Sequence, residues 1–214
     1  MIELDGDWQL ALDEIVFPKT WYNVGRDEVW FEISPAWNRV ALRPGYYPTV
    51  ASLYHAFDAE MKKARIANIA LVHNHNSSRI SIAVQRGFRL RLSSRLKNLL
   101  GFESEYVDSG MHKSTRGIDV DENRQLLFIY CNVLDSRIVG GSFAPVLAVV
   151  DSQGRYGSVI HKHYNRPRYH DVQKKRFDTI TTHIKDATGK AIPFETDRVI
   201  ASLHLRKHVF DVTQ

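Results

Sequence analysis

Two H-x-H pairs are the residues best suited to metal chemistry, one at 73–75 and one at 161–163. Residues two apart on a strand share a face, so each pair could supply two metal ligands. Cupin-type β-barrels add a nearby carboxylate to such a pair. Neither 76–80 nor 164–167 contains one, and Asp171 stands at a spacing that fits no metal motif. We therefore predict no metal site and no cofactor.

Groups suited to nucleophilic or acid–base catalysis are equally poorly arranged. The single cysteine, Cys131, lies within an apolar run, and the chain contains no G-x-S-x-G motif. Asp13 and Glu14 are adjacent, so an extended strand points them to opposite faces. Gly140-Gly141 lacks the lysine and the helix of a phosphate-binding loop. We predict no catalytic residue and a protein that is not an enzyme.

Aromatic and basic residues suggest binding rather than catalysis. Trp21, Trp30 and Trp37 fall close together, which suits base or sugar stacking, although core or interface packing is the favoured interpretation. Basic residues gather at 86–97 and again at 164–176, the second time with two tyrosines. Solvated surface is the favoured interpretation of the first, and contact with phosphates stays open for both.

Composition sets broad limits. The 214 residues are 43% hydrophobic and 25% charged, as in ordinary globular domains. Basic residues number 29 against 24 acidic ones, a net charge of +5 that permits weak nucleic-acid contact without requiring it. No apolar run approaches the ~20 residues of a membrane span, and we expect no secretory signal. One cysteine fits a reducing compartment.

Period-two alternation predicts most of the secondary structure. Residues 8–17 read as a strand with a phase slip at Asp13-Glu14 that indicates a bulge. The runs 177–185 and 199–207 read as two strands facing each other across a polar turn at 186–189. A further hairpin is expected from residues 80–84 and 88–92.

Other segments complete the picture. Thr49 is expected to cap a helix that ends near Arg65, and Ser93 or Ser94 a short helix that Gly101 ends. Residues 103–124 read as a long surface loop, and 126–134 as a strand buried on both faces. Many short strands separated by turns predict an all-β fold, a β-sandwich or barrel.

Five segments, in order along the chain, resemble the minor capsid (penton) proteins of Polinton/Maverick elements and related adintoviruses. They are WQLALDEIVFPKTWYNV, RPGYYPTV, LSSRLKNLLGF, LLFIYCNVLDSRIVGGSFAPVL, and FDTI followed by IKDATGKAIPFETDRVIASLHLRK. The resemblance implies a single jelly-roll β-sandwich with short inserted helices. We expect one domain over 1–214, with a hairpin/helix insertion around 24–65 and a long loop around 103–124.

The resemblance also implies a function. The chain would form the pentameric vertex of an icosahedral virion, as a homopentamer beside a double-jelly-roll major capsid protein. It would be made in reducing host compartments, the cytoplasm or nucleus. A monomer in isolation and weak genome contact through the basic patches stay open. The alternative is a β-sandwich module that binds glycan or single-stranded nucleic acid through exposed tryptophans.

Overall fold

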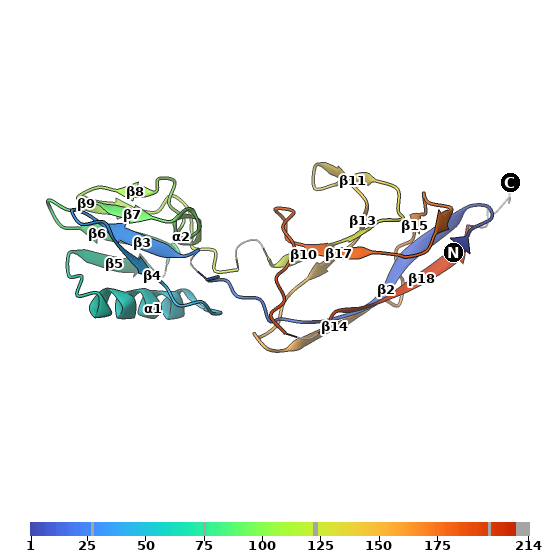
Figure 1. Ribbon diagram of the computed structural model, residues 1–214, viewed down its shortest axis with the longest axis horizontal. Coiled ribbons are helices and arrows are strands. Elements are labelled where there is room, and N and C mark those ends of the chain that lie inside the picture. Colours follow the sequence, from blue (N-terminus) through green and yellow to red (C-terminus); the bar gives the residue numbers. More distant parts are fainter. Residues whose placement is uncertain (27, 75, 122–123, 197, 209–214) are drawn as a thin grey trace. The chain divides into compact units, whose positions relative to one another are not determined.

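The computed structural model describes residues 1–26, 28–74, 76–121, 124–196 and 198–208. It divides into two compact units, both drawn in Figure 1. The first unit comprises Met1–Trp21 and Asn123–Gln214, and the second unit comprises Tyr22–Glu122. The second unit is therefore an insertion in the first, and it extends well beyond the insertion expected at 24–65.

The first unit is built from β-strands. Its longer strands are β2 (Trp8–Pro18), β10 (Leu126–Cys131), β13 (Val146–Asp151), β14 (Val159–His163), β17 (Thr182–Lys185) and β18 (Ile200–Lys207). Its short strands are β1 (Ile2–Glu3), β11 (Arg137–Val139), β12 (Ser142–Ala144), β15 (His170–Asp171) and β16 (Arg176–Phe177). Strand β2 pairs with β14, β15 and β18, while β10 lies between β13 and β17 in another sheet.

These two sheets enclose one core, which makes the first unit a sandwich. Leu10, Leu12 and Phe17 of β2 meet Leu127 and Ile129 of β10 there, all at most 3% exposed. The strand order is nested: the first and last long strands, β2 and β18, are antiparallel neighbours, and so are the next pair inward, β10 and β17. Nested antiparallel pairing is typical of a jelly roll. The all-β sandwich class predicted from the sequence is confirmed.

The predicted phase slip in β2 is also confirmed. Ser202 pairs with Glu14 and Leu203 with Leu12, so Asp13 has no partner on β18. An extra residue of this kind is a β-bulge, which lets the side chains on either side of it keep facing the core. Leu12 and Ile15 are both buried although their positions differ by three.

The second unit combines two small sheets with two helices. Its strands are β3 (Trp30–Ile33), β4 (Asn38–Ala41), β5 (Ile69–Asn74), β6 (Arg79–Val84), β7 (Leu90–Leu92), β8 (Tyr106–Val107) and β9 (Gly110–Lys113). Its helices are α1 (Val50–Lys63) and α2 (Ser94–Leu100). The sheet orders are β4-β3-β7-β8 and β5-β6-β9. Neither helix, in the described part of the chain, is long and apolar enough to cross a membrane.

Local sequence signals define both helices, as predicted. Thr49 caps α1 by accepting a hydrogen bond from the Ser52 amide at 3.1 Å. Leu53, Phe57 and Met61 recur every four residues, so they share one face of α1, and all three are buried. The ring of Phe57 stacks on Phe31 of β3, with centroids 4.4 Å apart, and joins helix and sheet in one core.

Two predicted strand pairings are wrong. Strands β6 and β7 do not form a hairpin, because β6 pairs with β5 and β9 while β7 pairs with β3 and β8. Likewise β17 and β18 do not pair with each other: β17 joins β10 and β18 joins β2. In both cases the strands exist but lie in different sheets. Alternation identifies a strand and its buried face, but it does not identify the neighbouring strand.

Two further expectations need correction. The segment expected as a loop at 103–124 contains strands β8 and β9. The strand expected to be buried on both faces has only one buried face: Leu127 and Ile129 are 1% exposed, whereas Leu126 is 47% exposed and Phe128 is half-buried. The second face carries apolar residues that are exposed or half-buried.

Candidate interaction surfaces

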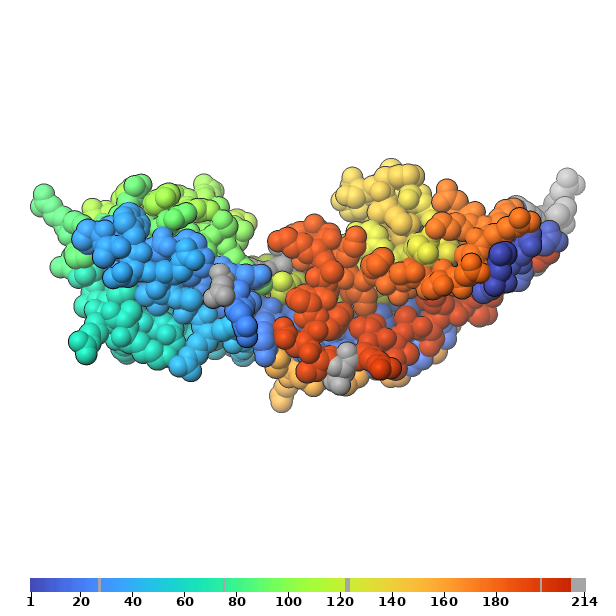
Figure 2. Space-filling model, in the orientation of Figure 1, coloured from blue at the N-terminus to red at the C-terminus, as the bar shows by residue number. Residues whose placement is uncertain are grey.

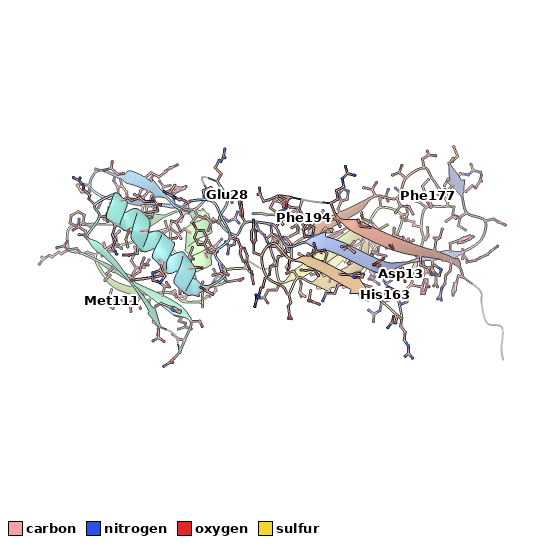
Figure 3. The ribbon with its side chains drawn as sticks, turned by 90° about the horizontal axis from the view of Figure 1, so that it is seen from below. Asp13, Glu28, Met111, His163, Phe177 and Phe194 are labelled. Atoms are coloured by element: carbon pink, nitrogen blue, oxygen red, sulfur yellow. The ribbon has the colours of Figure 1, made fainter. Side chains whose placement is uncertain are left out.

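The second H-x-H pair lies on β14 and meets a carboxylate that the sequence analysis missed. His161 Nε2 lies 2.5 Å from Glu14 Oε1, across the pairing of β14 with β2. The other Glu14 oxygen accepts a hydrogen bond from Ser202 Oγ at 3.3 Å. His163 is paired with Glu14 in the strand register and so shares this face; Figure 3 labels His163 together with Asp13 of β2.

Strand pairing, not sequence spacing, creates this contact, since Glu14 and His161 are 147 positions apart. Only the strand order could have revealed it. Among the described residues, no three His, Cys, Asp or Glu side chains gather closely enough to hold a metal ion. The arrangement is therefore a surface hydrogen-bonded network that joins β2, β14 and β18.

The first H-x-H pair, His73 and His75, is described only in part. His73 lies on β5, two positions from buried Leu71, and is itself half-buried. His75 lies outside the described residues. His112 of β9 pairs with buried Ile82 and shares the inner side of the same sheet. These histidines belong to the margin of the second unit's core.

A different imidazole, His170 of β15, is the most strongly perturbed. Burial, together with the positive charges of Arg137 and Arg168, lowers the pKa of His170 to about 4. Arg137 Nη1 contacts His170 Nδ1. At neutral pH the imidazole is therefore uncharged, which allows a guanidinium to pack directly against it.

An aromatic–arginine surface covers the outer side of the sheet β4-β3-β7-β8 in the second unit. We define it by Trp30, Trp37, Tyr106, Arg39, Arg89 and Arg91. The guanidinium carbon of Arg39 lies 4.1 Å from the Trp30 ring centroid, and that of Arg91 lies 5.4 Å away. Arg89 lies 4.5 Å from the Tyr106 ring, which meets Trp37 edge to face. Cation–π contacts thus link the four strands β4, β3, β7 and β8.

Carboxylates of the same chain form ion pairs with these arginines and so compensate their positive charge. Glu32 accepts hydrogen bonds from Arg39 Nε at 3.1 Å and from Arg91 Nη1 at 3.3 Å. Asp108 pairs with Arg89 at 2.7 Å. These contacts reduce the positive charge available to a phosphate.

The three tryptophans have different environments. Trp21 is 1% exposed and packs edge to face on Phe194, 5.7 Å between ring centroids. Trp30 is half-buried under two guanidinium groups. Trp37 is 40% exposed. Core packing is therefore the correct interpretation for Trp21, whereas Trp30 and Trp37 face outward.

The second basic patch, residues 164–176, is spread over the surface of the first unit. Arg176 Nε donates to Glu3 at 2.7 Å, and Lys175 lies 3.5 Å from Asp7. Tyr169 stacks against Arg206 of β18, whose guanidinium carbon lies 3.4 Å from the ring centroid. These contacts connect β16 to β1, and the residue before β15 to β18.

Of the comparisons with known proteins, the one with solved structures gave a match. No family model matches the chain, and no curated protein matches it. Among solved structures, the chain is similar to the crystal structure of selenomethionine-labelled mavirus penton protein, with 13% identity and a TM-score of 0.45. The match covers 95% of this chain and 86% of that one. No residue role follows from a likeness at this level.

Proposed function

We propose that this chain is a structural capsid protein that forms the pentameric vertex, or penton, of an icosahedral Polinton-like particle. The observation that carries the proposal is the nested sandwich of the first unit, in which β2 pairs with β18 and β10 with β17. Vertex proteins need a rigid body that presents fixed surfaces to its neighbours, and two sheets packed on a common core supply one.

Three of the five segments that carry the sequence resemblance contain strands of this sandwich. Of the five resembling segments, one covers β2, one runs from β10 into β13, and one contains β18 and the end of β17. The shared residues are thus concentrated where they determine the strands and core of the first unit. The remaining two segments lie in the second unit, before α1 and along α2.

The mechanism is assembly by symmetry. A head-to-tail contact between copies closes into a ring when each copy is rotated by a fifth of a turn. The outer rim of the ring would then contact a double-jelly-roll major capsid protein. In this proposal the protein is not an enzyme, resides in the virion, and is made in the reducing cytoplasm or nucleus of a host cell.

Co-expression with the major capsid protein of the same element tests the proposal. Electron microscopy of the particles is expected to show this chain as a plug at each five-fold vertex. Omitting its gene is expected to leave vertices open or shells unformed. Complete, closed shells in its absence would overturn the vertex role.

The aromatic–arginine surface favours a second candidate function, a binding module for glycan or single-stranded nucleic acid. Exposed Trp37 beside Tyr106 offers ring faces for stacking, and Arg39 and Arg91 lie over Trp30. Titration with oligothymidylate and with a glycan panel distinguishes the ligands. Binding that Trp37→Ala abolishes, while Met111→Ala on the other sheet leaves it intact, would support this function over the vertex role.

A further inference from the structure

The first unit contains an open groove between its two sheets. Strands β17 and β18 follow one another along the chain but belong to different sheets, and each pairs with a single long strand of its own sheet. The sheets therefore separate along these two strands instead of being joined by hydrogen bonds. Ala191, Ile192, Phe194 and Val199, from the segment between the two strands, contribute to the lining of the groove.

The groove has a volume of about 490 Å³, which lies within the range of ligand pockets in proteins. Its lining is mixed: Thr182, His183 and Lys185 are polar, and the other lining residues are apolar. The half-buried apolar residues are Ile180, Ile184, Phe194, Val199, Ala201 and Leu203. In a closed sandwich such side chains would be covered, so the groove leaves core-forming residues in contact with water.

The same unit carries an unusually exposed apolar projection, the hairpin of β11 and β12. Ile138 and Phe143 are directly opposite each other in the pairing of these strands, and they are 78% and 76% exposed. Gly140 and Gly141 both have positive φ, 57° and 82°, as a tight two-residue turn requires. Among the described residues, no other strand pairs with the hairpin, and Figure 2 shows it in yellow, standing out from the surface.

We propose that the groove between β17 and β18 receives the β11–β12 hairpin of a second copy of this chain. The proposal rests on the vertex function, because it names the head-to-tail contact that such a ring needs. Each copy then presents one projection and one groove, so the contact is heterologous and can repeat around a ring.

Chemical complementarity favours a second copy as the occupant. The hairpin segment from Ile138 to Phe143 reads IVGGSF and has no charged residue, so it can leave water without stranding a charge. The cation at the groove, Lys185, lies 4.7 Å from the ring of Tyr130 and does not require an acidic partner. The groove and the hairpin thus both present apolar side chains at the surface of one unit.

The small size of the proposed contact is also compatible with a ring that forms only on the particle. A single hairpin tip buries much less than the roughly 1,600 Å² of a standard interface, so two isolated copies should associate weakly. In a closed ring every copy uses both its hairpin and its groove, so the contacts support one another. A weak pairwise contact avoids premature rings and becomes stable on the particle.

Cross-linking between two batches of full-length protein tests the contact. One batch carries Phe143→Cys, the other carries Ala201→Cys and a heavy-isotope label, and the native Cys131 is buried at 1% exposure. The batches are mixed at about 1 mM, where even a millimolar contact is substantially occupied, and mildly oxidised. Peptide mass spectrometry then detects the disulfide between copies, and native mass spectrometry counts the chains.

We expect the yield of the disulfide between positions 143 and 201 to be at least about tenfold higher than the yield with a control partner. In the control, Val72→Cys replaces Ala201→Cys and places an exposed thiol on the second unit. Adding Ile138→Ser to the Phe143→Cys chain should reduce the disulfide toward the control. No excess over the control would overturn the contact. Five-chain assemblies without the disulfide would overturn the contact alone, whereas the disulfide in assemblies of another size would overturn the five-fold vertex and leave the contact standing.

Discussion

At the scale of single residues, His170 makes the first unit sensitive to acid. Its pKa in the folded protein is about 4, against an ordinary value of 6.5. Between these two values the unfolded chain binds a proton that the folded chain does not, so stability falls as the pH decreases from 6.5 to 4. Above pH 6.5 this residue has no effect on the pH dependence.

Replacing His170 by Asn should therefore flatten the decline of stability across that window. Denaturant unfolding at a series of pH values from 7 to 4, by the change in midpoint, measures the effect. His163→Asn serves as the control, because His163 is exposed. Equal slopes for the His170→Asn variant and the original protein would contradict the burial of this imidazole.

The two faces of β10 give a second prediction. Ile129 is 1% exposed in the core, and Leu126 on the opposite face is 47% exposed. Ile129→Ala should cost about 2–5 kcal/mol of unfolding free energy, and Leu126→Ala at most about half a kcal/mol. Chemical denaturation measures both; similar costs would show that the outer face of β10 is also covered.

Residue-scale features were predictable from sequence where they depend on near neighbours. The turn after β17 is an example: Asp186 Oδ1 accepts hydrogen bonds from the Thr188 and Lys190 amides at 2.8 and 3.0 Å, and Gly189 has φ +84°. The contact of Glu14 with His161 was not predictable, because it depends on which strands pair. Sequence spacing carries no information about such a contact.

At the scale of elements, the end of α2 is the most constrained point of the second unit. Gly101 has φ +77°, and a Cβ there would lie 2.4 Å from the carbonyl oxygen of Arg116. Gly87 has a similar φ of +89°, but a Cβ there would meet no atom within 4 Å. The two glycines therefore separate the effect of backbone conformation from that of close packing.

Gly87→Ala should cost only the left-handed backbone penalty, about 1–2 kcal/mol. Gly101→Ala should cost clearly more, because the backbone around Arg116 must also move. Thermal and denaturant unfolding of the two variants provides the comparison. Equal destabilisation would mean that the loop around Arg116 moves freely away from α2.

The helices and the longer strands were predictable, whereas the short strands β8 and β9 and the pairing of strands were not. Caps, helix faces and the β2 bulge follow from local patterns, and all are present. The pairing of β6 with β5 instead of β7 depends on the inner faces of two sheets that meet around α1 and α2. Likewise, the separation of β17 from β18 depends on β2 and β10, which are remote in sequence.

At the scale of the whole molecule, the two units have separate hydrophobic cores that share no residue. The inserted unit also ties its own ends together. Asn23, only 2% exposed, donates through Nδ2 to the carbonyl oxygens of Tyr47 at 2.8 Å and of Val120 at 2.9 Å. Its Oδ1 accepts a hydrogen bond from the Tyr47 amide at 2.8 Å. Entry and exit of the insertion are thus held by one side chain.

We therefore predict that residues 22–122, expressed alone, fold and unfold cooperatively. Dispersed amide resonances and a single unfolding transition would establish this, and a collapsed spectrum without protected amides would refute it. Within this fragment Asn23→Ala should cost about 1–3 kcal/mol, because it leaves buried backbone groups without partners. Asn76→Ala, at an exposed turn position, should change stability by no more than about half a kcal/mol. A fragment that folds but tolerates Asn23→Ala equally well would show that the core alone, and not the link between its ends, maintains the inserted unit.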